Sequence, residues 1–393
     1  MAEGVYLDYA STSPLDPRVR DCMLTAMDDK AGFGNPSATN HAYGQAAGAM
    51  VATAAQQVAG LVNGDPELLV WTSGATESDN LAIIGGAEFR RGRGRHVIAV
   101  TTEHKAVLSA CDALEHRGWS ITRLQPDADG LISAQQVADA IRDDTTLVSV
   151  MHVNNETGVV QDIAAIGERC RAAGVLLHTD AVQSAGRLPL DMQSMNIDLL
   201  TVNAHKVCGP KGIGALLLNP TTIRRVEPLL FGGGQQRGMR PGTLPVHQIV
   251  GMGEAFRLLS GEMADEVPRL TKLREQLWSG LSQLPGVILN GHPQQRSASI
   301  LTVSVSGVEG ESLRFALRDI AVTSGSACNS ATAEPSYVLR ALGHDDVLAE
   351  ASIRFSLGRF TTGADIEAAI DAFGTAVRHL RAVAATGAAS EAA

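Results

Sequence analysis

Short apolar segments alternate with helical patterns through the middle of this chain, from His96 to Leu218. An alternation of this kind predicts a mostly parallel β-sheet with helices on both faces, which is an α/β fold. The strands are expected at residues 96–101, 120–124, 146–153, 175–179, 199–202 and 215–218. The helices between them are expected at residues 104–116, 133–142 and 163–173.

Polar residues stand just past several of these expected strands. They are His104, Asn155, Asp180 and Lys206. In open α/β sheets, functional groups lie beyond the carboxyl ends of the strands. We therefore expect these side chains to meet at one edge of the sheet.

The pattern changes after Thr243, which we interpret as the approach to a second domain. A helix at 41–62, a strand at 68–71 and a helix at 72–91 precede the alternating region. After it we expect a long helix at 245–284, followed by strands at 299–305 and 352–357 and helices at 311–318, 335–342 and 364–383. This predicts a large domain over 15–257, a smaller α+β domain over 1–14 and 258–383, and a flexible tail over 384–393.

Composition argues against several classes of protein. Hydrophobic residues make up 45% of the chain and charged residues 19%, as in ordinary globular proteins. The net charge of −10 argues against a nucleic-acid partner. Because no segment resembles a signal peptide or is long enough to span a bilayer, we expect a cytoplasmic protein without a membrane partner. The five cysteines are scattered without a CxxC spacing, so we expect neither a disulfide framework nor an intrinsic metal site.

Lys206 and Asp180 together indicate pyridoxal phosphate chemistry. Lys206 ends the motif Asn203-Ala-His-Lys206 beside an apolar strand, where low-dielectric surroundings favour a nucleophilic amine. Taken alone, Lys206 is more typical of a solvated strand end, and Asp180 is as compatible with a capping residue as with a functional one. Pyridoxal phosphate requires a lysine that holds it covalently and a carboxylate that keeps its pyridine nitrogen protonated. The pair meets both requirements.

Three other features each have a chemical and a structural interpretation. Ser73-Gly-Ala-Thr76 suits phosphate binding at a helix start, although Ser and Thr are also ordinary helix caps. His104 suits stacking on a planar ring and acid–base work, although a lone histidine is often structural. Arg354 lies within an apolar strand pattern and needs a partner, which is either a substrate carboxylate or a carboxylate of the protein.

Cys328 differs from the other cysteines in its surroundings. It lies in a loop of small residues, Ser324-Gly-Ser-Ala-Cys-Asn-Ser330. A structural cysteine usually lies among large apolar neighbours, whereas a thiol on such a loop can reach a substrate. In a pyridoxal enzyme, its thiolate would attack a sulfur atom of the substrate.

These motifs resemble the group I cysteine desulfurases (IscS/NifS-like), and within them the housekeeping IscS type of iron–sulfur assembly. The resemblance extends from Tyr6 to about Thr362. Its segments are TSGATESDNL at 72–81, TEHKAV at 102–107, HVNNE at 152–156, HK with GPKGIGA at 205–215, SGSAC at 324–328 and EPSYVLRALG at 334–343. The resemblance implies a homodimeric fold-type I enzyme that converts L-cysteine to L-alanine and leaves a persulfide.

The resemblance also implies roles for individual residues. Around the cofactor ring it places Lys206 on the covalent link, Asp180 on the pyridine nitrogen, Gln183 on the phenolic oxygen, and His104 as the stacking and catalytic residue. Around the phosphate it places Ala75, Thr76, Asn203 and His205, with Thr243 reaching over from the second subunit. Asn155 would contact both cofactor and substrate, Arg354 the substrate carboxylate, and Cys328 the transferred sulfur.

The expected partners are L-cysteine and a sulfur acceptor, either an iron–sulfur scaffold or a tRNA-thiolation relay. With a scaffold, Cys328 would transiently ligate a 2Fe–2S cluster. The chain departs from the family in three places. Asn203 replaces a small hydroxyl residue, but its amide can still donate to phosphate. Pro241 replaces a common serine and removes a backbone donor beside Thr243. The Ala-rich tail is shorter than the aromatic-containing tail that helps relatives dock the scaffold.

Other functions on the same fold remain open at this point. They are a selenocysteine lyase, an aminotransferase, and a desulfurase dedicated to DNA phosphorothioation. A thiol on a small-residue loop argues against an aminotransferase, which needs none. A non-catalytic sulfur-relay subunit is a further alternative, and the intact set of Lys206, Asp180 and Cys328 argues against it.

Overall fold

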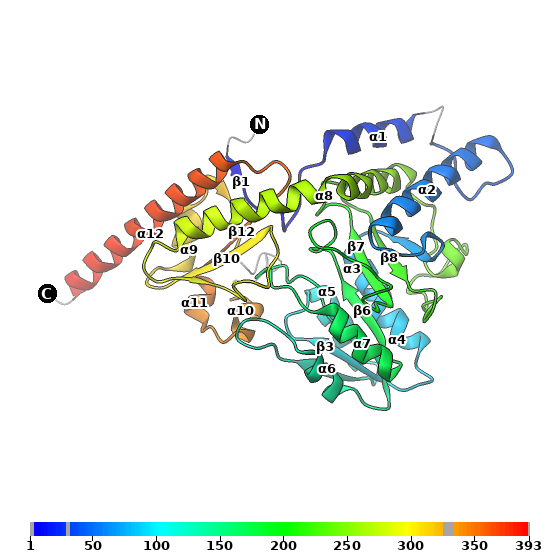
Figure 1. Cartoon of the computed structure of the whole chain (residues 1–393), viewed down its shortest axis with the longest axis horizontal. Helices are drawn as coiled ribbons and strands as arrows, with labels where there is room; N and C mark the ends of the chain where they lie inside the picture. The colour runs from blue at the N-terminus through cyan, green and yellow to red at the C-terminus, as the bar shows by residue number, and fades with distance from the viewer. Residues whose placement is uncertain (1–3, 29–31, 325–333, 392–393) are drawn as a thin grey trace.

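The computed structural model describes residues 4–28, 32–324 and 334–391 of the chain (Figure 1). A seven-stranded mixed sheet forms its centre. In spatial order its strands are β2 (Leu69–Thr72), β8 (Gly214–Leu218), β7 (Leu199–Asn203), β6 (Leu176–Asp180), β5 (Thr145–Ser149), β3 (His96–Val100) and β4 (Ser120–Leu124). Strands β3 to β7 run parallel, while β8 lies antiparallel between β7 and β2.

Helices cover both faces of this sheet, because successive side chains of a strand point to opposite faces and both sets are apolar. Leu176 and Leu199 pack in one core with the π-helical segment η2 (Leu81–Gly85), which follows α3 (Ala75–Asn80), and with α4 (Gly86–Phe89) and α5 (Lys105–Glu115). Leu177 and Leu200 pack in the other with α2 (Ala42–Leu61), α6 (Ala134–Ala140), α7 (Ile163–Ala173) and part of α8 (Val246–Leu281). The predicted α/β fold with a mixed, mostly parallel sheet is confirmed.

The helix predicted over 72–91 is divided. A π-helical segment, η2 (Leu81–Gly85), separates α3 from α4. A short 3-10 helix, η1 (Pro66–Leu68), directly precedes β2 in the chain. A second one, η3 (Gln236–Gly238), contacts β2 through hydrogen bonds between Gln236 and the backbone of Trp71. The predicted start also moves to Ala75, because Gly74 adopts a φ of 153° as the residue before the helix. The stretch 73–74 therefore remains a loop at the end of β2.

A second, smaller group of elements surrounds a three-stranded antiparallel sheet. Its strands are β12 (Ser352–Ser356), β10 (Ile300–Val305) and β9 (Val287–Leu289). Around it lie α9 (Gly310–Ala316), α10 (Tyr337–Ala341), α11 (Asp346–Glu350) and α12 (Gly363–Glu391). A parallel pair, β1 (Val5–Tyr6) and β11 (Ile320–Ala321), brings the N-terminal segment to this sheet. That pair places Asp8 opposite Ser356.

Helix α8 links the two groups, with α1 (Pro17–Met27) packed near its first half and α12 along its second half (Figure 1). Ile249 and Phe256 of α8 belong to the core of the large sheet, whereas Leu270 and Leu277 belong to the core of the small one. The division at residues 14–15 and 257–258 stays a prediction, and it falls where α8 passes from one core to the other.

The C-terminal helix is longer than expected. The sequence predicts its end at Val383, but α12 continues to Glu391, so most of the predicted tail has a helical backbone. Within residues 4–28, 32–324 and 334–391, no helix is both long enough and apolar enough to cross a membrane.

Candidate active site

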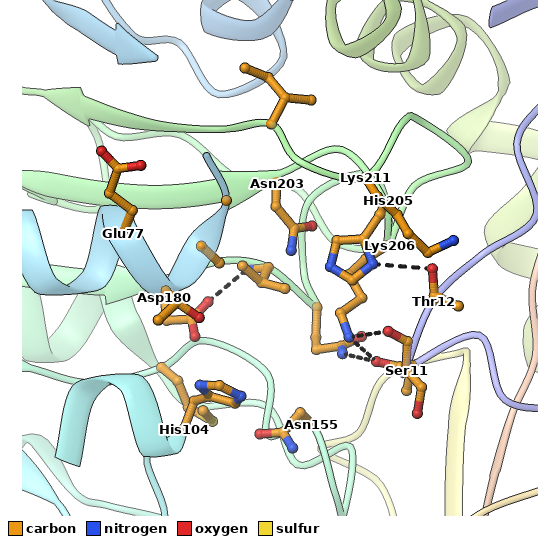
Figure 2. Close-up of a pocket in the computed structure, with 18 of the residues that line it drawn as sticks. Ser11, Thr12, Glu77, His104, Asn155, Asp180, Asn203, His205, Lys206 and Lys211 are labelled. Carbon is orange, nitrogen blue, oxygen red and sulfur yellow. Dashed lines mark hydrogen bonds between the residues drawn. The ribbon is translucent and has the colours of Figure 1, made fainter. Parts of the chain in front are cut away.

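A cavity of about 510 Å³ opens at the carboxyl edge of the large sheet, a size suited to a cofactor and a small substrate. Figure 2 shows side chains from several strand ends pointing into it. Ten of the predicted site residues line it: Ala75, Thr76, His104, Asn155, Asp180, Gln183, Asn203, His205, Lys206 and Arg354. The prediction that the strand-end side chains meet at one edge of the sheet is thus confirmed.

The strand geometry explains this convergence. Asp180 is the last residue of β6 and Asn203 the last of β7, the next strand in the sheet. Gly214 pairs with both Thr72 and Asn203 as β8 passes between their strands. A Cβ on Gly214 would lie only 2.8 Å from the backbone carbon of Gly74. Glycine at this position therefore allows β8 to pass directly against the loop that begins α3.

The N-terminal segment 10–12 forms one wall of the cavity, which the sequence analysis did not anticipate. Lys206 Nζ donates hydrogen bonds to the carbonyl oxygens of Ala10 (2.5 Å) and Ser11 (2.6 Å). His205 Nδ1 lies 3.2 Å from Thr12 Oγ1, and Figure 2 draws the contacts of both Lys206 and His205. The available signal in the sequence is the run Ser11-Thr-Ser-Pro14, which consists mostly of small hydroxyl residues.

Asp180 lies at the floor of the cavity and is almost fully buried. Its Oδ1 accepts a hydrogen bond from the backbone N–H of Val182 at 2.9 Å. Burial raises the pKa of Asp180 above its usual range, although the nearby His104, the hydrogen bond from Val182 and the Lys206 amine lower it in part. A cationic group in the cavity would therefore be stabilised by the Asp180 carboxylate.

Asp79 of α3 lies beneath the floor with its side chain fully buried. Its Oδ1 is 3.6 Å from Nε2 of His178, two residues before Asp180 on β6. Burial raises the pKa of Asp79 well above its usual range, and the charge of Asp180 raises it further. Burial lowers the pKa of the His178 ring to about 3, so His178 is neutral near pH 7 and Asp79 favours its protonated form.

Two histidines of the site are held in defined states. Nδ1 of His104 accepts a hydrogen bond from the backbone N–H of Ala106 at 3.1 Å, so His104 caps the start of α5. Burial and the charges of Lys206 and Lys211 lower the pKa of His205 to about 4. His205 is therefore neutral near pH 7.

Two amide side chains of the cavity have unsatisfied polar atoms. The side-chain oxygens of Asn155 and Asn203 are buried, and neither meets a hydrogen-bond partner within the described residues. Buried polar atoms in native proteins are nearly always paired. A polar ligand between these amides would supply the missing partners, with each amide free to turn its NH₂ or its oxygen toward it.

Arg354 pairs with a carboxylate of the protein, one of its two possible partners. Its Nη2 lies 3.0 Å from Oδ1 of Asp8, so the partner is a carboxylate of the protein itself. Its Nη1 donates to the carbonyl oxygen of Asn155 at 2.8 Å. Next to this group, burial raises the pKa of Glu156 to about 7, and Glu156 accepts a hydrogen bond from the hydroxyl of Ser336.

The roles of two other predicted site residues stay predictions. Thr243 is exposed just before α8 and does not line the cavity of its own chain, so its role toward a second subunit stays a prediction. Cys328 lies outside the described residues. Among residues 4–28, 32–324 and 334–391, no cluster of three or more His, Cys, Asp and Glu side chains is arranged to hold a metal ion.

Comparisons with known proteins agree with this arrangement. The model of the aminotransferase class-V family matches residues 5–369. The cysteine desulfurase IscS of Proteus mirabilis (strain HI4320) is 53% identical over 377 residues, which cover 96% of this chain and 93% of that protein. A solved NifS-like protein has a TM-score of 0.88 at 30% identity, covering 96% of this chain and 100% of the other. DndA from Streptomyces lividans has a TM-score of 0.75 at 39% identity, covering 89% and 99%.

Proposed function

The chain belongs to the aminotransferase class-V family, and from that premise we propose that it is a pyridoxal phosphate-dependent cysteine desulfurase. It converts L-cysteine to L-alanine and retains the sulfur as a persulfide on Cys328. The observation that carries this proposal is the meeting of Lys206, Asp180 and His104 in one cavity, in a chain 53% identical to a cysteine desulfurase.

Three observations indicate that the cavity suits pyridoxal phosphate. The carboxylate of Asp180 at its floor calls for a positively charged partner, which a protonated pyridine nitrogen supplies. The buried oxygens of Asn155 and Asn203 are without partners among the described residues. The loop before α3 lies close against Gly214, and Gly74 caps α3 without a side-chain hydrogen bond, which leaves backbone N–H groups for a phosphate.

Each lining residue then has a role toward the cofactor. Lys206 would hold it covalently, Asp180 would pair with its ring nitrogen, Gln183 would contact its phenolic oxygen, and His104 would stack on its ring. Ala75, Thr76, Asn203 and His205 would hold its phosphate, and Thr243 of the partner subunit would complete that site. When bound, pyridoxal phosphate withdraws electrons from the Cα of an amino acid.

The chain's own groups carry out the proton and sulfur transfers. Arg354 and Asn155 hold the substrate carboxylate and so fix the position of Cα. Lys206 Nζ removes the proton from Cα as a general base. The Cys328 thiolate attacks the substrate Sγ, so that a sulfur–sulfur bond forms while the Cβ–Sγ bond breaks and Cβ takes up a proton. Lys206 then returns a proton to Cα, so that L-alanine leaves and the persulfide stays on the enzyme.

A substrate comparison tests this function. The purified enzyme is incubated with L-cysteine or L-selenocysteine, and L-alanine is quantified together with sulfide or selenide released by a reductant. We expect alanine from L-cysteine and none with Lys206→Ala. Alanine from selenocysteine alone would reject the desulfurase in favour of a selenocysteine lyase. A protein without a cofactor absorbance band would be a non-catalytic relay subunit instead.

We also propose which acceptor receives the sulfur, how the enzyme assembles and where it is located. We place the enzyme in the cytoplasm as a homodimer that serves an iron–sulfur scaffold or a tRNA-thiolation relay. Cys22, Cys111, Cys170 and Cys208 are all free thiols, which suits a reducing compartment. Capture of acceptors from a host lysate on the full chain and on a chain ending at Val383 tests the acceptor and the need for the C-terminal segment.

A further inference from the structure

Arg354 is the proposed contact of the substrate carboxylate, yet its guanidinium is already engaged. Nη2 lies 3.0 Å from Asp8 Oδ1 and donates to Ser11 Oγ at 2.7 Å. Nη1 donates to the carbonyl oxygen of Asn155 at 2.8 Å. Nε is buried and has no hydrogen-bond partner within the described residues. The protein itself thus occupies most of the group that has to receive the substrate.

The planar shape of the guanidinium determines what a second carboxylate can do. A carboxylate binds arginine most strongly through two parallel N–H donors. One such edge of the group consists of Nε and Nη2 and the other of Nη1 and Nη2, so Nη2 belongs to both. Asp8 and Ser11 occupy the two hydrogens of Nη2. A substrate carboxylate can therefore bind in the bidentate manner only where one of them withdraws.

We propose that Asp8 is an internal counter-ion of Arg354 that the substrate carboxylate displaces, and that Asp8 thereby sets the affinity for the α-carboxylate. This inference rests on the proposed function, because it takes Arg354 as the carboxylate site. The substrate gains the Nε–Nη2 edge, which includes the donor that has no partner among the described residues. Asp8 is then a positioning residue that acts through Arg354.

The surroundings of Asp8 make this exchange feasible. Its Oδ1 also accepts hydrogen bonds from Ser11 Oγ at 2.8 Å and from Thr323 Oγ1 at 3.4 Å. The carboxylate therefore retains donors after Arg354 has turned to the substrate. The side chain of Asp8 is 15% exposed, whereas that of Arg354 is 3% exposed. The pair thus lies at the border of the cavity, where the carboxylate can move toward water and the guanidinium cannot.

A purely structural ion pair predicts a different outcome. In that case Asp8 would only hold Arg354 in place, and neutralising it would loosen the guanidinium and weaken carboxylate binding. In the exchange proposed here, Asp8 competes with the substrate, and neutralising it strengthens carboxylate binding. The two accounts therefore differ in the sign of the effect.

Asp8→Asn tests this sign, because it keeps an oxygen acceptor for Arg354 and removes the charge. Asp144→Asn is the matched control, since it also removes one negative charge from an aspartate paired with an arginine, at the exposed Arg142–Asp144 pair. Steady-state KM and kcat for L-cysteine are measured in the loaded enzymes. Binding constants are measured for L-alanine, which carries the carboxylate, and for ethylamine, which lacks it.

We expect Asp8→Asn to lower the KM for L-cysteine and the dissociation constant of L-alanine about three- to tenfold, as expected for the loss of a competing, partly exposed ion pair. The kcat, the ethylamine constant and all constants of Asp144→Asn stay near wild type. Unchanged or higher values for both carboxylate ligands in Asp8→Asn would overturn the inference. A wild-type enzyme that makes no alanine from L-cysteine would instead refute the proposed function.

A measurement on the wild type covers the case in which Asp8→Asn does not fold. Crystal structures with and without bound L-alanine should differ at one contact. We expect Asp8 Oδ1 to lie beyond hydrogen-bond distance of Arg354 Nη2 when the ligand carboxylate is bound. An Asp8–Arg354 contact that persists beside a bidentate ligand would overturn the inference.

Discussion

Gly214→Ala is the most direct test of the cofactor cradle. The new Cβ would lie 2.8 Å from the backbone carbon of Gly74, 2.9 Å from its Cα and 3.0 Å from the carbonyl oxygen of Val202. Real Cβ atoms do not approach backbone atoms so closely. Because β8 is held in the sheet by both β2 and β7, the loop that begins α3 has to move instead. That loop is the proposed phosphate site.

The size of the effect follows from the cost of such overpacking, which is about 1–3 kcal/mol. In the ligand-free protein the loop can shift toward the cavity and relieve the contact. Cofactor binding then has to restore the loop, so most of the cost is expected in the binding step. At about 1.4 kcal/mol for each tenfold change, the dissociation constant of pyridoxal phosphate should rise roughly five- to a hundredfold.

The assay is a titration of the cofactor-free protein with pyridoxal phosphate, followed by absorbance of the complex. Gly261→Ala in α8 is the matched control, because a Cβ there meets no atom within 4 Å. The control should bind the cofactor as the wild type does and gain about 0.5–1 kcal/mol in stability from the higher helix propensity of alanine. If Gly214→Ala also bound the cofactor with wild-type affinity, the cradle would lie elsewhere and the argument would fail.

Three other predictions concern residues of the site. Asp180→Asn should lower kcat at least about tenfold, because it replaces a charged hydrogen bond worth about 1.5–3 kcal/mol, and steady-state kinetics would refute this if kcat stayed unchanged. The pKa of Glu156 is raised from its ordinary value of 4.5 to about 7, so the folded protein keeps this proton to a higher pH than the unfolded chain does. The stability of the protein therefore falls as the pH rises from 4.5 to about 7. Relative to Glu156→Gln, the wild type should lose up to about 3 kcal/mol across that range in urea unfolding, whereas parallel pH profiles would contradict the assignment. Asn203→Ser should change cofactor affinity only slightly, since amide and hydroxyl both donate to phosphate, and a change beyond about tenfold in the same titration would show that the amide is essential.

The positions of the strand-end residues could be predicted from the sequence because the carboxyl ends of parallel strands meet at one edge. Asp180 and Asn203 illustrate this, since each ends a strand and both line the cavity. The direction of β8 could not be predicted in the same way, because a fully buried strand has the same apolar pattern in either orientation.

The contribution of the N-terminal segment could not be predicted because it depends on contacts between distant parts of the chain. Lys206 binds the carbonyl of Ser11 across 195 positions, and Arg354 pairs with Asp8 across 346. Hydrophobic periodicity reports only local structure. For Arg354 the sequence indicated that a partner was needed but not which one. The sequence prediction also ends α12 too early, at Val383, because it treats the Ala-rich segment as a tail. Alanine favours helix, and α12 continues to Glu391.

The persulfide on Cys328 is the central claim, and mass spectrometry of the enzyme after L-cysteine, without reductant, tests it directly. The other cysteines serve as internal controls, since burial raises the pKa of both Cys111 and Cys170 to about 12 and leaves them without a reactive thiolate. We expect the peptide containing Cys328 to gain the mass of one sulfur atom, with one L-alanine formed per sulfur. Cys328→Ala should keep the cofactor absorbance and lose both the sulfur and the turnover. Continued sulfide production by Cys328→Ala, or sulfur found on another cysteine of the wild type, would contradict the account.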